Sequence, residues 1–183
     1  MEQRPLLILD IDETLIHGRE TPLGRDCDFR AGKFYIYLRP NVRQFLGTIS
    51  ETYDLACWSA ASKDYLDVVV NELTSGLDCS LLFVWDRSRC TRRVDFVYQE
   101  EYFLKDLKKV KRKGFDLKRV LILEDEPRKV HRHFGNAIYV KPFEGAEDDE
   151  ELLKLGAFLE SIREIPDFRQ LEKRFWRSDT LEK

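Results

Sequence analysis

Two aspartates, Asp10 and Asp12, stand two positions apart at the end of the apolar run "PLLILDI" near the start of the chain. Side chains at i and i+2 of an extended segment project to the same face, so both carboxylates can approach one point. Two anions this close repel each other, and each raises the proton affinity of the other unless a cation or a donor intervenes. The pair therefore predicts a bound divalent cation or a shared proton, and magnesium suits carboxylate and carbonyl oxygens.

A second acidic pair, Glu124 and Asp125, ends another apolar run, "RVLILEDEP". Between the two pairs lie a hydroxyl, Ser59 in "CWSAAS", and a lysine, Lys105 in "YFLKDL". This combination is typical of phosphoryl transfer. A metal ion and a lysine neutralise charge, a hydroxyl and backbone amides hold phosphate oxygens, and an aspartate attacks phosphorus. Taken singly, each residue has a structural explanation, because Asp and Thr cap helices and Ser favours turns.

The apolar runs that precede these residues alternate with helical patterns along the chain. Strand-like runs cover residues 5–11, 33–40, 53–59, 81–86, 93–99, 119–127 and 136–142. Helical patterns cover residues 41–50, 62–76, 104–114 and 148–164, and residues 17–33 are expected to form a loop. Such alternation predicts an α/β fold with a doubly wound, mostly parallel sheet. Ligands of such sheets bind beyond the carboxyl ends of the strands, where the polar side chains cluster.

The composition is that of an ordinary globular protein of 183 residues, with 43% hydrophobic and 36% charged residues. We expect one domain over residues 1–183, with a candidate small β insert at 78–104. The net charge of −3 gives no reason to expect nucleic acid, and no segment approaches the roughly 18 apolar residues of a membrane span. The four cysteines lack CxxC spacing and the N-terminal segment lacks a signal-peptide pattern, so a cytoplasmic or nuclear protein is expected.

The stretch "LDIDETLIHG" resembles the DxDxT opening of haloacid dehalogenase (HAD) superfamily phosphatases. The longer DxDETLxH run is similar to the branch that dephosphorylates serines in the RNA polymerase II C-terminal domain (CTD). The resemblance continues through "YLRPNVRQFL", "CWSAASKDY", "LKDL", "RVLILEDEP" and "HFGNA", and spans about residues 5–140. It implies a HAD-like Rossmannoid fold, a phosphoric monoester hydrolase, magnesium as cofactor and an aspartyl-phosphate intermediate.

By this resemblance, Asp10 is the nucleophile that takes the phosphoryl group. Asp12 protonates the leaving alkoxide and then activates water, and such acid–base help is worth roughly 100- to 10,000-fold. Thr14 is expected to position Asp12. The implied phosphate-binding set is Thr14, Ser59, the backbone amide of Ala60, and Lys105, which is also implied to pair with Asp10. The implied metal-binding set is Asp10, Asp12 through its backbone carbonyl, Asp125, and Glu124 through a water molecule.

The chain departs from the family pattern at two positions. The first residue of the second acidic pair is usually Asp, whereas here it is Glu124, which puts metal affinity in question. This branch usually has Thr at the position of Ser59, but the hydroxyl is kept, so we expect little loss.

No stretch of the chain leaves room for a large cap domain, so we expect an open site. An open site fits a phosphoserine or phosphothreonine of a protein better than a small metabolite. Candidates for a peptide groove beside the phosphate are Trp85, Arg87, Arg89, Arg92, Arg93, Phe96 and Tyr98. Two alternatives stay open: a catalytically weak phosphoprotein-binding or scaffold relative of the same fold, and a small-metabolite phosphatase. We expect a monomer with no nucleic-acid or membrane partner.

Overall fold

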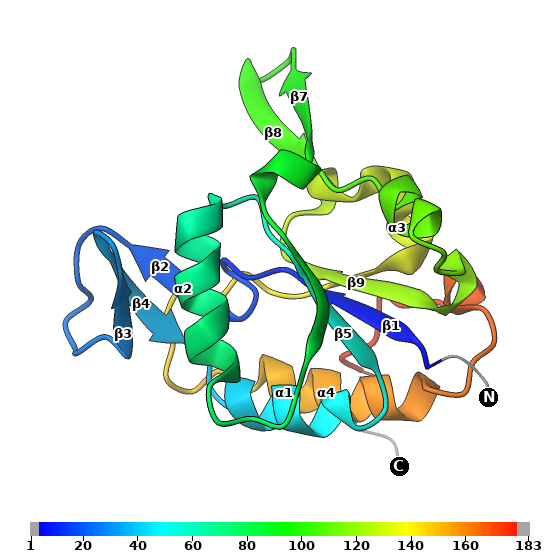
Figure 1. Ribbon diagram of the computed structural model, residues 1–183, viewed down its shortest axis with the longest axis horizontal. Helices are drawn as coiled ribbons and strands as arrows, with labels where there is room; N and C mark the ends of the chain where they lie inside the picture. Colours follow the sequence, from blue (N-terminus) through cyan, green and yellow to red (C-terminus); the bar gives the residue numbers. More distant parts are fainter. Residues whose placement is uncertain (1–3, 179–183) are drawn as a thin grey trace.

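A computed structural model of the chain describes residues 4–178. Its centre is a five-stranded parallel sheet with strand order β10-β9-β1-β5-β6 (Figure 1). The strands are β1 (Leu6–Leu9), β5 (Asp54–Trp58), β6 (Leu81–Trp85), β9 (Val120–Glu124) and β10 (Ala137–Tyr139). The three inner strands consist almost entirely of buried residues, as strands covered on both faces must. The predicted doubly wound α/β fold is confirmed.

The strand order brings the chemically active strand ends together. β1 pairs with β5 on one side and with β9 on the other, and Leu9 lies opposite Cys57. The carboxyl ends of parallel strands meet at one edge of a sheet. Asp10, Ser59 and Glu124 therefore emerge on neighbouring strands at the same edge.

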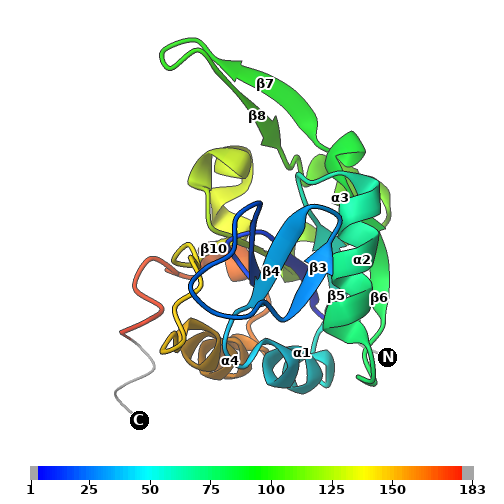
Figure 2. The ribbon, with the colours of Figure 1, turned by 90° about the vertical axis from the view of Figure 1, so that its left-hand side faces the viewer.

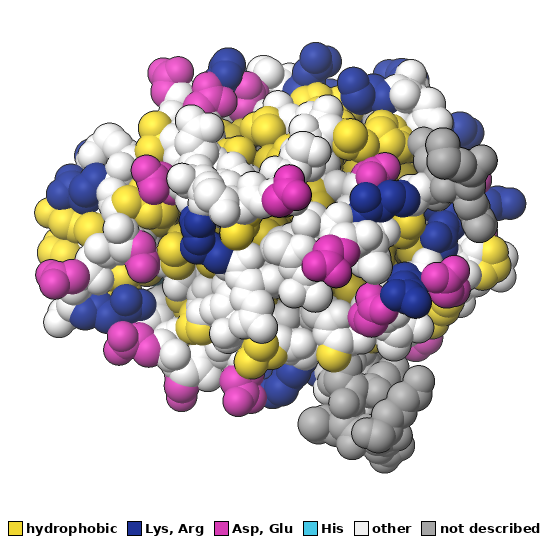
Figure 3. All heavy atoms as spheres, turned by 60° about the horizontal axis from the view of Figure 1, so that its bottom comes forward, with side chains coloured by type: hydrophobic (Ala, Val, Ile, Leu, Met, Phe, Trp, Pro, Cys, Tyr) yellow, Lys and Arg dark blue, Asp and Glu magenta, His cyan; other side chains and the backbone are white. Residues whose placement is uncertain are grey.

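Helices cover both faces of the sheet. The apolar sides of α1 (Val42–Ser50), α2 (Lys63–Thr74) and α4 (Glu151–Ile162) share one core with one face of the sheet. The short α3 (Lys108–Arg112) covers the other face through Val110 (Figures 1 and 2). Where α1 and α4 face outward, basic and acidic side chains are interspersed, as on an ordinary solvated surface (Figure 3).

A second sheet is antiparallel and has the order β2-β4-β3. Its strands are β2 (Ile16–Arg19), β3 (Phe29–Ala31) and β4 (Phe34–Leu38). The expectation of a loop over residues 17–33 is therefore wrong at both ends of that range. These short, partly exposed segments become strands because β4 pairs with each of them, and such pairing leaves no clear mark on the local sequence.

Residues 78–104, expected as a small insert, divide between two structures. β6 is the edge strand of the central sheet, whereas β7 (Thr91–Asp95) and β8 (Glu100–Leu104) form a hairpin that projects from the body (Figures 1 and 2). The strand expected over residues 93–99 is interrupted by the turn of this hairpin. The reason is local, because the carboxylate of Asp95 accepts two backbone N–H groups of the turn.

α1, α2 and α4 begin and end within three residues of the predictions, whereas the helix expected over residues 104–114 covers only Lys108–Arg112, because Leu104 still belongs to β8. α2 follows Ser62, and Gly114 lies just after α3 with a φ of 99°, a left-handed conformation that favours glycine. Residues 4–178 contain no separate cap domain. Within the same residues, no helix has both the length and the apolar character needed to cross a bilayer.

Candidate active site

Asp10 follows the last residue of β1, where its backbone N–H donates to the carbonyl of Leu123 at 3.3 Å. Its side chain is buried, and Oδ1 accepts a 2.5 Å hydrogen bond from Nζ of Lys105. The hydroxyl of Thr14 donates to the other oxygen, Oδ2, at 3.4 Å. Burial, and after it the charge of Glu124, raises the pKa of Asp10. The carboxylate is thus oriented at both oxygens and sits where a cation would stabilise its charged form.

Asp12 lies in the turn after β1, and its carboxylate accepts hydrogen bonds from a residue just after β5 and from a residue of α2. Oη of Tyr65 donates to Oδ1 at 2.7 Å, and Oγ of Ser59 donates to Oδ2 at 3.4 Å. Burial raises the pKa of Asp12, and the hydrogen bond from Tyr65 opposes this rise. A raised pKa favours the protonated form, which is the form that a general acid needs.

Lys105 connects the ends of β1 and β9. Its Nζ lies 2.5 Å from Oδ1 of Asp10 and 2.7 Å from Oε2 of Glu124, and all three side chains are buried. Burial disfavours the ammonium, but the two carboxylates outweigh it and raise the pKa of Lys105. The lysine therefore stays charged, and the long side chain of Glu124 reaches it directly.

Carboxylate oxygens of Asp10, Glu124 and Asp125 lie within 4.8 Å of one another. Hard oxygen donors at this spacing fit a divalent cation such as magnesium. A second lysine, Lys129, lies against the same cluster, with Nζ within 3.5 Å of the carboxylates of Glu124, Asp125 and Glu126. Burial disfavours this ammonium too, but the surrounding carboxylates outweigh burial and raise the pKa of Lys129.

The two aspartates open into a cleft of about 310 Å³. Among its lining residues are Ser59, Ala60, Tyr65, Arg87 and Lys129. A larger cavity of about 540 Å³ lies between η4 (His131–Asn136) and the C-terminal segment, and it shares no lining residue with this cleft. We place the chemistry in the smaller cleft because Asp10 and Asp12 line it.

The sequence-predicted residues come together at this edge of the sheet, but two of them differ in part from what was expected. Thr14 was expected beside Asp12, and its hydroxyl instead contacts Asp10. Lys105 is fully buried, and the lysine that lines the cleft is Lys129. Ser59 lies beside Asp12 as its place after a strand predicted, and its Oγ accepts the backbone N–H of Ala61 at 3.0 Å.

Sequence reasoning missed Tyr65, Lys129 and Gly18. Tyr65 lies in the first turn of α2, directly after the "CWSAAS" run, so its place near Ser59 was the available signal. Lys129 lies four residues after Asp125, across the turn that begins at Pro127. Gly18 gives Tyr65 room, because a Cβ atom there would lie 2.6 Å from the tyrosine Oη.

Residues 5–169 match the family described as NLI interacting factor-like phosphatase. The chain belongs to this family. The resemblance predicted from the motifs is thereby confirmed.

Relatives of this NLI interacting factor-like chain include a protein named as phosphatase-like and a protein named as a translocase subunit. CTD small phosphatase-like protein 2 of Dictyostelium discoideum is 28% identical over 170 residues, which cover 89% of this chain and 28% of the relative. The mitochondrial import inner membrane translocase subunit TIM50 of Kluyveromyces lactis is 30% identical over 176 residues, which cover 94% of this chain and 33% of the relative. The chain therefore spans less than half the length of either relative.

Among solved structures, the RNA polymerase II CTD phosphatase Fcp1 of fission yeast has a TM-score of 0.59 at 18% sequence identity. The likeness covers 97% of this chain and 49% of that chain. At this level of identity it shows that the NLI interacting factor-like chain and Fcp1 share a fold.

Proposed function

We propose that the chain is a magnesium-dependent phosphatase that hydrolyses phosphoserine or phosphothreonine of a protein, and that it works as one domain. The observation that carries this proposal is the meeting of two strand ends. Oxygens of Asp10 lie within 4.8 Å of those of Glu124 and Asp125, and Lys105 connects Asp10 to Glu124. Membership of a phosphatase family supports the reaction class.

In the first step, an oxygen of Asp10 attacks phosphorus while the bond between phosphorus and the seryl oxygen breaks. Lys105 and Thr14 hold the attacking carboxylate in place. Asp12 donates its proton to the leaving alkoxide, and the rise of its pKa on burial keeps that proton available. A magnesium ion held by Asp10, Asp125 and the backbone carbonyl of Asp12 would supply the positive charge that offsets phosphate and carboxylates.

In the second step, Asp12 accepts a proton from the water molecule that attacks the aspartyl-phosphate. Inorganic phosphate leaves, and Asp10 regains its carboxylate. The bonds from Tyr65 and Ser59 keep Asp12 directed into the cleft through both steps. Ser59 and Ala60 line the cleft, which supports the hydroxyl of Ser59 and the backbone amide of Ala60 as donors to phosphate oxygens.

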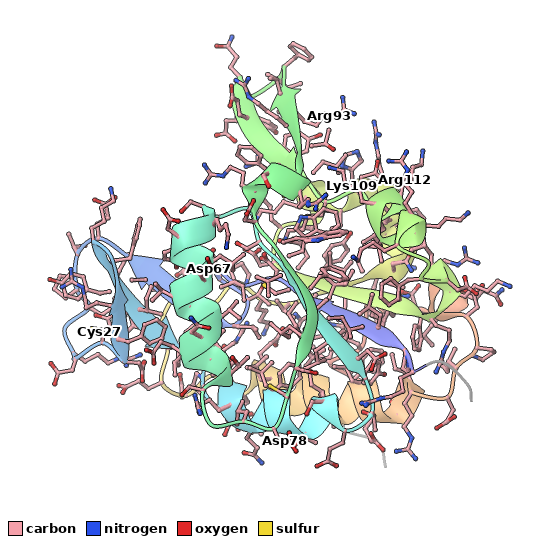
Figure 4. The ribbon with its side chains drawn as sticks, in the orientation of Figure 1. Cys27, Asp67, Asp78, Arg93, Lys109 and Arg112 are labelled. Atoms are coloured by element: carbon pink, nitrogen blue, oxygen red, sulfur yellow. The ribbon has the colours of Figure 1, made fainter. Side chains whose placement is uncertain are left out.

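A protein substrate is supported by the basic character of the chain segment that begins at the cleft residue Arg87 and carries the hairpin and α3. Residues 87–133 contain 15 Lys and Arg against 8 Asp and Glu, although the whole chain has a net charge of −3. Arg87 lines the cleft, Arg93 lies on the hairpin, and Lys109 and Arg112 lie on α3 (Figure 4). A positive flank of this size attracts an anionic phosphorylated segment.

The aromatic candidates for a peptide groove separate into two groups. Trp85 is buried in the core and cannot contact a substrate. Phe96 and Tyr98 lie at the tip of the projecting hairpin, where they are 89% and 73% exposed. The peptide-facing surface that we propose therefore runs from Arg87 at the cleft to these two side chains.

The decisive experiment is a magnesium-dependent assay on a phosphoserine peptide library with wild type and Asp10→Asn. We expect the variant to lose turnover because an amide cannot attack phosphorus, whereas Asp78→Asn, an exposed change outside the cleft, should keep it (Figure 4). Beryllium fluoride should bind to wild type in the presence of magnesium and should not bind to Asp10→Asn. Near-normal rates for Asp10→Asn would contradict the mechanism.

One observation favours the scaffold alternative: a relative of the chain is named as a subunit of a translocase. The same assay separates the alternatives. Binding of phosphopeptides without turnover would favour a scaffold. Turnover of small phosphometabolites but of no phosphopeptide would favour the small-metabolite enzyme.

A further inference from the structure

Lys129 is the second ammonium group of the acidic cluster. Its Nζ lies 3.3 Å from Oε1 of Glu124, 3.5 Å from Oδ1 of Asp125 and 3.2 Å from Oε2 of Glu126. Its side chain is only 17% exposed, so the charge is poorly screened by solvent. One lysine thus lies beside both acids that end β9.

The backbone holds Lys129 in this position. Lys129 is the last residue of the one-turn helix η3 (Pro127–Lys129), and its backbone N–H donates to the carbonyl of Glu126 at 3.0 Å. Its own carbonyl accepts the N–H of Lys105 at 2.7 Å. The two lysines of the site are therefore tied together through the main chain, and the side chain of Lys129 starts from a fixed point beside the cluster.

We propose that Lys129 is a tethered cation that competes with magnesium for the carboxylates at the end of β9 and so sets the magnesium affinity of the site. The inference rests on the proposed function, because it takes Asp125 as a metal-binding residue. Without magnesium, the ammonium offsets part of the negative charge of the cluster. With magnesium bound, the same ammonium faces a like charge, which weakens metal binding.

Lys129 also lines the cleft, so a direct contact with substrate phosphate is the competing explanation. The two explanations differ in what they predict without phosphate. A competitor of the metal changes magnesium binding when no phosphate is present. A phosphate ligand leaves that binding unchanged and alters the binding of inorganic phosphate.

The test is calorimetric titration of magnesium into the metal-free full chain, without phosphate, for wild type, Lys129→Met and Lys129→Arg. We expect Lys129→Met to bind magnesium about tenfold more tightly or better, and Lys129→Arg, which keeps the charge, to resemble wild type. Lys111→Met is the matched control, because it removes an exposed lysine of α3 that does not line the cleft. Circular dichroism checks that each variant is folded, and Lys129→Gln replaces Lys129→Met if the latter is not.

Unchanged or weaker magnesium binding by Lys129→Met would overturn the inference while leaving the proposed function in place. The same holds if this variant loses only its affinity for inorganic phosphate in a second titration. Equal tightening by Lys111→Met would also overturn it, because a general loss of positive charge would then explain the effect. Failure of wild type and all variants to bind magnesium would contradict the metal in the proposed function and the inference with it.

Discussion

The phenol of Tyr65 donates a 2.7 Å hydrogen bond to Oδ1 of Asp12 across 53 residues of sequence. Burial and the charge of Asp12 raise the pKa of Tyr65, so the tyrosine remains a donor. The bond in turn stabilises the charged form of Asp12. In the proposed mechanism, Tyr65 is a positioning residue for the general acid.

Replacing Tyr65 with Phe removes this bond and keeps the ring. The pKa of Asp12 should then rise further, so the alkaline limb of kcat/KM, where the protonated acid is lost, should move to higher pH. At neutral pH we expect kcat/KM for a phosphoserine peptide to fall about three- to tenfold, a part of the roughly 100- to 10,000-fold that acid catalysis supplies. A pH profile of both proteins measures the shift.

The control for Tyr65→Phe is p-nitrophenyl phosphate, whose leaving group needs little protonation. Its kcat/KM should change less than that of the phosphoserine peptide. An alkaline limb that stays in place, or moves to lower pH, would contradict the positioning role.

Substitution of Gly18 should lower activity, because this glycine leaves room for the side chain of Tyr65. A Cβ atom at Gly18 would lie 2.6 Å from Oη of Tyr65 and 3.2 Å from Cδ1 of Ile36. Gly18→Ala should displace the ring from Asp12 and lower kcat/KM in the same direction as Tyr65→Phe. In a double-mutant cycle, the two losses should not add, because both act through one hydrogen bond. Additive losses would show that Gly18 acts by another route.

Lys105→Met leaves the buried carboxylates of Asp10 and Glu124 without the cation between them. We expect the free energy of unfolding, measured in urea, to fall by about 3–5 kcal/mol. Lys105 lowers the pKa of both acids, so its loss raises them, and protonation at low pH relieves the repulsion. The deficit should therefore shrink as the pH falls, whereas Lys111→Met should change stability by less than about 0.5 kcal/mol at any pH.

A half-buried ion pair, in which Arg39 is buried and Asp149 is partly exposed, supports the turn that carries Asp12. Nε and Nη2 of Arg39 each lie 2.8 Å from an oxygen of Asp149, and Nη1 donates to the carbonyl of Thr14 at 3.0 Å. Arg39→Met should cost about 1.5–3 kcal/mol in urea unfolding, because it removes charged hydrogen bonds while Asp149 stays accessible to water. The exposed pair of Lys63 and Asp67 is the comparison, and its loss should cost less than about 1 kcal/mol.

The stabilisation that the pair of Arg39 and Asp149 contributes should decrease as the pH falls. Burial opposes ionisation of Asp149, but its hydrogen bonds, chiefly from Arg39, outweigh burial and lower its pKa. The stabilisation is therefore present at neutral pH and is lost as the pH falls through the lowered pKa. Equal costs of Arg39→Met at neutral and acidic pH would contradict this account.

Substitutions at the hairpin tip should lower kcat/KM for protein substrates alone. Phe96→Ser combined with Tyr98→Ser changes two exposed side chains, so stability and turnover of p-nitrophenyl phosphate should stay as in wild type. If the tip contacts the substrate, kcat/KM for a phosphoprotein should fall about tenfold, mainly through KM. Equal kcat/KM on phosphoprotein for both proteins would remove the hairpin from the proposed substrate surface.

The sequence by itself determined the order of most helices and strands and the kind of chemistry. Buried strands such as β1 and β9 are continuous apolar runs, and the residues that end them are readable because strand ends in a parallel sheet share one edge. Asp10, Glu124 and Asp125 were therefore predicted to meet, and their carboxylates do lie together. The secondary-structure predictions at residues 17–33 and 93–99 were wrong because the segments there are short and exposed. In such segments strand pairing and turn geometry outweigh the local preference of the residues for a strand or a loop.

Only the tertiary structure decided which side chain holds each carboxylate. Asp12 is held by Tyr65, Asp10 is held by Thr14 in addition to the expected Lys105, and the acids that end β9 lie beside Lys129. Such hydrogen bonds depend on the order β9-β1-β5 and on the placement of elements far apart in the chain to within a few tenths of an ångström. Apolar periodicity specifies which face of an element is buried, whereas a hydrogen bond requires two particular atoms to meet, and packing of the whole sheet brings them together.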